Sequence, residues 1–283
     1  MEGRVCLVTG ATSGIGRETA LGLAARGATV VVHGRDPARA RDAAAEIARA
    51  TGRPLVAPLV ADLSSQAEVR RLAAEVRAKH ERLHVLVNNA AIITPTRTTT
   101  VDGLETQLAV NHLAPFLLTN LLLDVLKASA PARIVDVASQ VESMGAIDFE
   151  DLGRARRSYE RLDVYAQSKL ANVLFTYELA RRLAGTGVTA NCLHPGVIGT
   201  NLLAAYEGRP GPLKFLSRRG RPTPREGAET SLYVASAPEL EGVSGKYFRE
   251  SREAVSSPRS RDVELAARLW VVSEKLVGIG PSP

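Results

Sequence analysis

Cysteine and aromatic side chains are scarce in this chain. Its 283 residues include two cysteines and one tryptophan, and aromatic residues make up 4%. Cys6 and Cys192 lie in separate apolar runs, without a CxxC or any other metal-ligand spacing. We therefore expect neither a metal site nor a disulfide framework, and interpret both as buried packing residues in a reducing compartment.

Long apolar stretches and targeting segments are also not evident. We find no secretory signal and no apolar run of about 18 residues, the length that spans a membrane. A strand is predicted from Val5, which leaves no room for an anchor before it. These observations predict a soluble, cytoplasmic protein without a membrane anchor.

Acidic residues are somewhat fewer than basic ones, 30 against 36, and the formal net charge is +6. Binding to nucleic acid requires basic residues concentrated on one patch or helix. Here they are scattered along the chain, so we expect no nucleic-acid partner. No internal repeat and no linker rich in Pro, Gly or Ser divides the sequence, and we expect residues 1–283 to form one domain.

What is present is an alternation of short apolar runs with longer helical patterns, which is typical of βαβ units in a parallel sheet buried on both faces. The predicted strands are Val5–Thr9, Thr29–His33, Leu55–Pro58, Val85–Asn88, Arg133–Ala138, Val188–Leu193 and Lys246–Phe248. The predicted helices are Ile15–Arg26, Pro37–Arg49, Gln66–His80, Leu104–Ala128 and Val164–Leu183, with a C-terminal helix at about 261–276. We expect an α/β fold of the Rossmann type, a doubly wound parallel sheet of about seven strands with helices on both faces.

Residues 199–224 contain the run EGRPGPLKFLSRRGRPTP, which is too long for an ordinary connection. Such loops near a ligand crevice are usually functional, so we predict a substrate lid here. Its apolar residues could cover a substrate or could equally pack the lid onto its own domain. These residues are Leu202, Leu203, Tyr206, Leu213, Phe215 and Leu216.

A glycine-rich turn, TGATSGIG, follows the first predicted strand and opens a helix. Its glycines Gly10, Gly14 and Gly16 are spaced GxxxGxG. Glycine permits a tight turn and lets backbone N–H groups approach a pyrophosphate, which then lies against the positive end of the helix dipole. Glycines also end strands for purely structural reasons, but the position at the first strand-to-helix junction favours a dinucleotide site.

The end of the second predicted strand, VVHGRD, bears on the choice of cofactor. A dinucleotide fold places there either an acid for a ribose 2′-hydroxyl or an arginine for a 2′-phosphate. Arg35 could pair with a phosphate, whereas Asp36 could cap the helix that begins at Pro37. Arginine is abundant throughout the chain, yet this position favours NADP(H) over NAD(H).

Tyr165 and Lys169, in YAQSK, are spaced i,i+4 on a predicted helix and share one face. Acid/base work near neutrality requires the tyrosine pKa of about 10 to fall. A neighbouring ammonium lowers it by stabilising the phenolate. An isolated YxxxK is more often a surface pair on an amphipathic helix, so the motif depends on its surroundings.

Those surroundings resemble the short-chain dehydrogenase/reductase family from about Arg4 to Phe248. The elements that carry the resemblance are, in order, TGATSGIG, Asp62-Leu63, NNAA at Asn88 to Ala91, Asn111, Ser139, YAQSK, and HPG at His194 to Gly196. Two departures from the family pattern are Ala91, where NNAG is usual, and Ala138, where a serine usually precedes the catalytic serine. Neither removes a reacting group.

The resemblance implies a catalytic tetrad. Tyr165 would be the general acid/base, Lys169 would modulate its pKa and hold the nicotinamide ribose, and Ser139 would hydrogen-bond the reacting oxygen. Asn111 would hold a water that relays protons through the lysine. Taken alone, Ser139 reads as a cap of the following loop and Asn111 as a polar helix residue satisfied by backbone.

The resemblance also implies the cofactor contacts. Asp62 would contact adenine, Asn89 would fix the strand beside the cofactor, and Pro195 to Thr200 would meet the nicotinamide carboxamide and the pyrophosphate. The family's NAD-type acid would fall at Gly34 and its NADP-type base at Arg35. The full set of expected cofactor-binding residues is Gly10, Thr12, Ser13, Gly14, Ile15, Gly16, Arg35, Asp62, Leu63, Asn89, Ala90, Tyr165, Lys169, Pro195, Gly196, Val197 and Thr200.

Three stretches resemble the retinol-dehydrogenase-like branch, whose members act on retinoids and other lipophilic alcohols and aldehydes. They are AVNHLAPFLLTNLLL, YAQSKLANVLFTYELARRL and VTANCLHPGVIGTNL. We expect an NADP(H)-dependent oxidoreductase with a lipophilic alcohol or carbonyl substrate. By fold-level analogy, the two long helices would form a homodimer or homotetramer, although their apolar faces could equally be covered within one chain.

Two other classes of protein share parts of this pattern. A non-catalytic NADP(H)-binding sensor or scaffold on the same fold would not need the intact tetrad. A nucleotide-sugar epimerase or dehydratase shares YxxxK, but usually has a TGxxGxxG turn and a longer C-terminal substrate domain. The sequence therefore favours the oxidoreductase.

Overall fold

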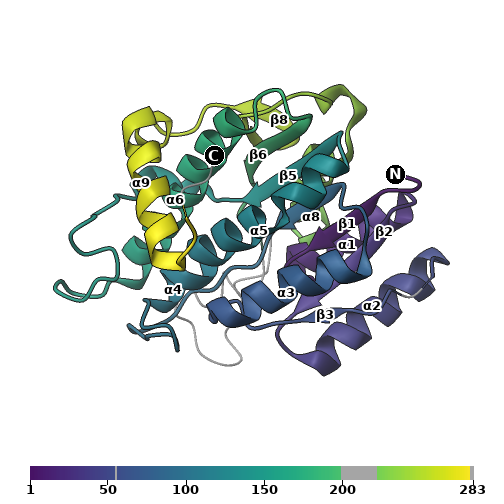
Figure 1. Cartoon of the computed structure of the whole chain (residues 1–283), viewed down its shortest axis with the longest axis horizontal. Coiled ribbons are helices and arrows are strands. Elements are labelled where there is room, and N and C mark those ends of the chain that lie inside the picture. The colour runs from purple at the N-terminus through teal and green to yellow at the C-terminus, as the bar shows by residue number, and fades with distance from the viewer. Residues whose placement is uncertain (55, 199–221, 281–283) are drawn as a thin grey trace.

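The structure, a computed structural model, describes residues 1–54, 56–198 and 222–280. Within them one sheet has the strand order β3-β2-β1-β4-β5-β6-β7-β8, and all neighbours are parallel except β7 and β8 (Figure 1). The strands are β1 (Val5–Val8), β2 (Thr29–Gly34), β3 (Leu59–Val60), β4 (Val85–Asn88), β5 (Ala132–Val137), β6 (Val188–His194), β7 (Tyr247–Arg249) and β8 (Arg252–Ala254). The order reverses direction between β1 and β4, as in a doubly wound fold.

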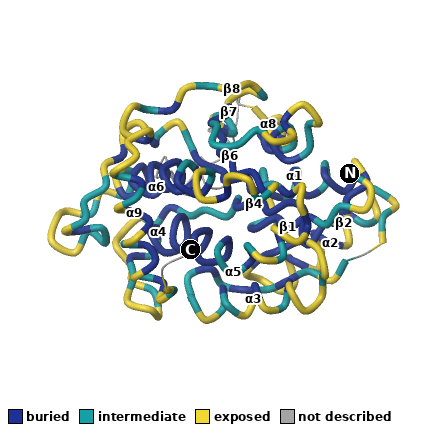
Figure 2. The backbone as a smooth tube through the Cα atoms, turned by 45° about the horizontal axis from the view of Figure 1, so that its top comes forward, coloured by how far each residue is buried: buried dark blue, intermediate teal, exposed yellow. Residues whose placement is uncertain are grey.

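Helices cover both faces of the sheet. On one face lie α1 (Gly14–Ala25), α2 (Pro37–Thr51) and α8 (Pro224–Ser236), and on the other lie α3 (Gln66–Lys79), α5 (Ala114–Ala128) and α6 (Arg161–Arg182). Side chains of β1 alternate between them: Leu7 packs with α3 and α5, whereas Cys6 and Val8 pack with α1 and α2. The central strands β1, β4, β5 and β6 are therefore buried on both sides, as Figure 2 shows, and the predicted fold class is confirmed.

The two cysteines are packing residues, as predicted. Cys6 on β1 and Cys192 on β6 are both buried and free. Burial raises the pKa of the Cys6 thiol to about 12 and that of Cys192 well above its ordinary value. Neither side chain forms a thiolate near neutral pH, so neither is a reactive group.

The predicted third strand is wrong in position. Leu55 lies outside the described residues, and 56–58 are not strand. The ladder with β2 instead begins at Leu59, which pairs with His33. Pro58 has no N–H to donate, so the strand starts after it.

Two elements were missed at the carboxyl end of the chain. α8 begins with a capping box in which Thr223 and Glu226 satisfy each other's backbone N–H groups, a signature visible in the sequence TPRE. β8 turns back on β7 through Glu250 and Ser251, both with positive φ, and it brings the described strands to eight. Of the predicted lid, residues 199–221 lie outside the described residues, and with them Thr200, a predicted cofactor contact.

The predicted helix Leu104–Ala128 is built from three parts. A short α4 (Thr106–Leu108) leads into a π-helical turn at Ala109–Leu113, which continues as α5. A π turn inserts one extra residue and rotates the side chains around it, and it often marks a functional site. Asn111 lies at the centre of this turn.

The C-terminal helix α9 (Val263–Val277) packs against α5 and α6 and covers their outer apolar surface (Figure 1). The Trp270 ring lies with its centroid 4.9 Å from that of Phe116 and 5.8 Å from that of Phe175. The Arg182 guanidinium stacks 4.2 Å from the Trp270 ring. The outer face of the two long helices is thus at least partly covered within one chain, and their use as an oligomer interface stays a prediction.

Candidate active site

A cavity of about 1000 Å³ opens at the carboxyl ends of the parallel strands. This is where ligands bind in doubly wound sheets, because the strand order reverses there and leaves a crevice. The cavity brings together nearly all the residues singled out in the sequence. Those that line it are Gly10, Thr12, Ser13, Gly14, Ile15, Gly16, Arg35, Asp62, Leu63, Asn89, Ala90, Ser139, Tyr165, Lys169, Pro195, Gly196 and Val197.

The glycine turn is sterically required. Gly10 has a φ of +65°, and a Cβ there would lie 2.9 Å from Ala90 Cα. A Cβ on Gly16 would lie 2.5 Å from Gly10 O and would also collide with the Asn89 amide. Larger residues would push the turn away from β4 and close the approach to the backbone.

The first turn of α1 presents its N–H groups to the cavity. Ser13 is the N-cap residue, but its side chain makes no capping hydrogen bond, and no acidic side chain lies in the first turn. The unpaired N–H groups and the positive end of the helix dipole therefore fit a phosphate group. On the β4 side, Asn89 holds the turn in place: its Nδ2 donates to Thr9 O at 2.8 Å and its N–H to Thr9 Oγ1 at 2.9 Å.

Arg35 follows β2 and lines the same cavity. Its neighbour Asp36 is committed elsewhere, because its carboxylate accepts from Ala38 N at 2.8 Å and from Arg39 N at 3.0 Å and caps α2. These bonds hold the pKa of Asp36 below its ordinary value. A second arginine, Arg39, also lines the cavity and was missed from the sequence, although it lies only four residues after Arg35, in the first turn of α2.

Tyr165 and Lys169 lie one turn apart on α6 and both face the cavity. Lys169 Nζ donates to Val137 O at 2.8 Å and lies 5.6 Å from the centre of the Tyr165 ring. Burial lowers the pKa of Lys169 to about 8, and the nearby charge of Asp136 opposes this shift. The lysine is therefore still largely protonated at neutral pH, and its charge lies beside the tyrosine.

Asp136 is a buried carboxylate that sequence reasoning missed. Its Oδ1 accepts from Asn88 Nδ2 at 2.8 Å and its Oδ2 lies 2.9 Å from Thr176 Oγ1. Burial raises its pKa to about 6 despite these bonds and the positive charge of Lys169. It stands on β5 directly before Val137, whose carbonyl holds Lys169, and a single aspartate inside a strand pattern gives no sign of such a role.

Ser139 and Asn111 are placed less simply. Ser139 lines the cavity and also caps a short 3₁₀ turn (Gln140–Met144), with its Oγ 3.4 Å from Val141 N. Asn111 does not line the cavity, because its side chain is fully buried. The Ile92 N–H donates to Asn111 Oδ1 at 2.8 Å, and Asn111 Nδ2 donates to Ile92 O at 3.0 Å. Its Nδ2 also donates to Ser168 Oγ at 3.1 Å. A role of Asn111 in proton relay stays a prediction.

One part of the cavity wall is apolar. Residues that follow β4 and β5, together with Val110 from the π turn, contribute branched aliphatic side chains to the lining of the cavity. The apolar residues are Ile92, Ile93, Val110 and Val141, and the polar ones among them are Thr106 and Gln140. No group of three or more metal-ligating side chains occurs within the ranges that the structure describes.

Comparison with known proteins identifies the class. The short chain dehydrogenase family matches residues 4–209. Among solved structures, an uncharacterized protein from Mycobacterium paratuberculosis is 35% identical, with a TM-score of 0.80 over 99% of this chain and 96% of that one. A short chain dehydrogenase from Shigella flexneri, solved with NADP, is 26% identical, with a TM-score of 0.70 over 89% and 98%. The chain therefore belongs to the short-chain dehydrogenase family, oxidoreductases that bind a nicotinamide cofactor.

Within the family, the match is to retinol dehydrogenases. Retinol dehydrogenase 13 of Mus musculus is 47% identical, over 99% of this chain and 85% of that protein. Retinol dehydrogenase 12 of Homo sapiens is 46% identical, over 99% of this chain and 88% of that protein. The resemblance to the retinol-dehydrogenase-like branch is confirmed.

The expectation of a cytoplasmic protein is wrong. The helical stretch Thr106–Ala128 is long and apolar enough to cross a membrane, with a mean hydropathy of 1.4. The matches to retinol dehydrogenases 13 and 14 do not support a cytoplasmic location either. The sequence does not show it as one continuous apolar run, because Asn111, His112 and Asn120 interrupt its apolar residues. Since 72% of its most apolar window is buried and core helices have the same composition, no membrane arrangement follows from it.

Proposed function

We propose that the protein is an NADP(H)-dependent oxidoreductase that interconverts a lipophilic alcohol and the corresponding ketone or aldehyde. One observation carries the proposal. The cavity that begins at the glycine turn and Arg35 extends to Tyr165 and Lys169, so a dinucleotide site and an acid/base pair share one space. A non-catalytic nucleotide sensor would not need that pair.

The residues of this cavity fit the cofactor. The first turn of α1 would hold the pyrophosphate, Arg35 the 2′-phosphate, and Lys169 the nicotinamide ribose. When bound, NADP(H) supplies or accepts the hydride. Arg35 is the feature that supports NADP(H) over NAD(H), since a guanidinium forms stronger, charge-assisted bonds with a phosphate than with a neutral ribose hydroxyl.

The proton is handled by the chain's own residues. In the reductive direction, Tyr165 Oη donates its proton to the substrate oxygen, and Ser139 Oγ donates a hydrogen bond to the same oxygen. The Lys169 ammonium stabilises the resulting phenolate by opposite charge in a buried site. In the oxidative direction the phenolate removes the proton from the alcohol.

The apolar wall supports a lipophilic substrate. Ile92, Ile93, Val110 and Val141 offer aliphatic surface in the same cavity as Tyr165. Among the described lining residues the lysines and arginines are Lys169, Arg35 and Arg39. The two arginines follow β2, where the 2′-phosphate of the cofactor would bind, so they would not be available to an anionic substrate. Aliphatic groups would be stabilised by removal of their surface from water.

The first experiment measures oxidation of NADPH and NADH by the purified protein with a panel of lipophilic aldehydes, ketones and quinones. Tyr165→Phe removes only the proton donor, so we expect turnover to fall by orders of magnitude while NADPH affinity changes by no more than roughly threefold. Unchanged turnover in the variant would contradict the mechanism. Tight NADPH binding without turnover of any substrate would favour a sensor.

A further inference from the structure

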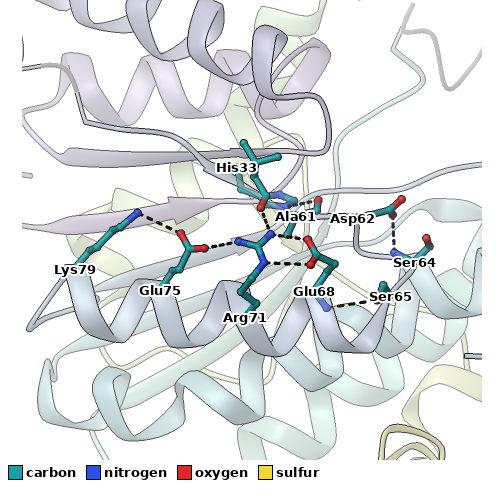
Figure 3. A network of polar contacts seen from close by, with 10 residues as sticks. His33, Ala61, Asp62, Ser64, Ser65, Glu68, Arg71, Glu75 and Lys79 are labelled. Atoms are coloured by element: carbon teal, nitrogen blue, oxygen red, sulfur yellow. Dashed lines mark hydrogen bonds and ion pairs between the residues drawn. The ribbon is translucent and has the colours of Figure 1, made fainter. Parts of the chain in front are cut away.

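His33 lies near the end of β2, between the loops that follow β1 and β3. Its side chain is 2% exposed and lines the cavity. Both ring nitrogens contact backbone. Nδ1 lies 3.3 Å from Gly10 N in the glycine turn. Nε2 lies 3.2 Å from Ala61 O after β3, the contact that Figure 3 shows. One imidazole therefore bridges the two loops on either side of its own strand.

The neighbours decide which nitrogen carries the proton. Gly10 N–H can only donate, so Nδ1 must accept, and the proton must be on Nε2, which donates to Ala61 O. A protonated imidazole would direct a second N–H at the N–H of Gly10 and break the bridge. Burial lowers the pKa of His33 to about 4, against an opposing effect from the Asp62 charge, so the ring is neutral at physiological pH.

The backbone of His33 adds a second bond to the glycine turn. Its carbonyl accepts from Ala11 N at 2.9 Å, next to the N–H of Gly10 that the ring accepts. Two successive amides of the turn are thus satisfied within the protein. The N–H groups left for a phosphate are those at the start of α1, and the position of that helix depends on the turn before it.

On the other side, the loop after β3 is held from two directions. His33 holds Ala61 O from within the sheet, and Arg71 Nη2 on α3 donates to Val60 O at 2.6 Å. Arg71 is itself fixed by ion pairs with Glu68 and Glu75, as Figure 3 shows. Asp62 is the next residue after Ala61, and its Oδ1 accepts from Ser64 N at 2.9 Å. The position of Asp62 in the cavity wall therefore depends on this loop.

We propose that His33 is a positioning residue for the cofactor: its neutral imidazole fixes the spacing between the glycine turn and the Asp62 loop, and so pre-forms the adenosine end of the site. The inference rests on the proposed nucleotide-binding function. It differs from a packing role because each nitrogen makes a separate, directional bond to a different loop. The chemistry at Tyr165 lies at the other end of the cavity and does not depend on this bridge.

The two bonds can be removed separately. His33→Phe fills the ring's place without either bond. His33→Asn puts an amide oxygen where Nδ1 accepts from Gly10, and His33→Gln puts an amide N–H where Nε2 donates to Ala61. His84→Phe is the matched control, because His84 Nδ1 accepts from Val5 N at 3.0 Å at the opposite end of β1 and does not line the cavity.

The probes are NADPH and its fragment 2′,5′-ADP, with dissociation constants from calorimetry and the urea unfolding midpoint of each variant. We expect His33→Phe to weaken both ligands by about tenfold or more, with Asn and Gln each restoring part of the loss. The KM for NADPH should rise in His33→Phe, whereas kcat, the turnover at saturating NADPH, should stay within roughly threefold of wild type. His84→Phe should lower stability and leave both affinities unchanged.

The outcomes distinguish a failure of the proposed function from a failure of the role proposed for His33. Wild-type protein that binds neither NADPH nor NADH overturns the proposed function, and the inference with it, before any variant is compared. Wild-type binding that His33→Phe retains overturns the inference alone. So does an equal loss in His33→Phe and His84→Phe, because it would show a general effect of stability.

Discussion

Arg35 and Asp36 are neighbours in sequence that serve different parts of the structure. The carboxylate of Asp36 caps α2, so it is not directed at a ribose, while Arg35 lines the cavity. After β2, the charged side chain that is free to recognise a cofactor is therefore the positive Arg35 and not the negative Asp36. An aspartate after the second strand need not indicate NAD(H) when its oxygens are already used by a helix.

We expect Arg35→Ala to weaken NADPH binding by about 10- to 100-fold, because a charge-assisted bond to phosphate is lost. NADH binding should change by no more than roughly threefold. Arg41→Ala is the control, because it also removes one positive charge, but from an exposed position on α2 that does not line the cavity. Binding of both nucleotides by fluorescence titration checks this, and an equal loss for NADPH and NADH would remove the assignment of the cofactor.

At the scale of elements, α9 packs against one side of α6, the helix that carries Tyr165 and Lys169. Trp270 packs against Phe116 of α5 and Phe175 of α6, and its Nε1 donates to Glu274 Oε1 at 2.8 Å. His112 Nε2 of the π turn also contacts Ser273 Oγ at 2.9 Å. α9 thus packs against the two elements that carry Asn111 and Tyr165.

Trp270→Ala should lower the free energy of unfolding by about 3–5 kcal/mol, the usual cost of removing a large buried aromatic side chain. Val271→Ala is the control on the same helix, because Val271 is 45% exposed and its loss should cost about 0.5 kcal/mol or less. Urea unfolding of both variants measures the difference. Equal losses would mean that the contact of α9 with α5 and α6 adds little stability.

The elements that the sequence predicted well are those with a strong local pattern. Buried strands such as Val85–Asn88 are continuous apolar runs, and a helix spacing places Tyr165 and Lys169 on one face regardless of what surrounds them. The predicted C-terminal helix likewise matches α9 closely. In contrast, β3 pairs with β2 through only two residues, so its position is set by a tertiary contact rather than by its own pattern.

The parts of the site that were not predicted share a different property. His33 and Asp136 are single polar residues inside strands, where a sequence gives no indication of which loops or charges lie beside them. The π turn at Asn111 changes the rotation of one helical turn without interrupting the helical pattern. Their roles arise from neighbours far away in the chain.

For the whole molecule, buried ionisable groups determine how stability depends on pH. Burial lowers the pKa of His33, His112 and His194 to about 4 in the folded state. In the unfolded chain they take up protons near pH 6.5. Between pH 6.5 and 4 the unfolded state therefore binds more protons than the folded state, and the free energy of unfolding falls as the pH falls.

Asp136 acts in the opposite direction. Burial raises its pKa to about 6, so as the pH falls the folded state takes up this proton before the unfolded state does. That uptake favours the folded state between pH 6 and 4. Each histidine removes up to about 3 kcal/mol by pH 4, and three histidines outweigh one aspartate. The window of acid destabilisation is therefore set by the histidines.

We expect the urea midpoint to fall steeply between pH 6.5 and 4.5. His112→Phe removes one of these groups from among the rings of Phe116 and Phe175, so it should make the pH dependence shallower, whatever it does to stability at pH 7. His80→Gln is the control, since His80 is only partly buried and its titration differs less between the two states. A slope in His112→Phe equal to that of the wild type would contradict the argument, because a histidine protonated equally in the folded and unfolded states adds nothing to the pH dependence.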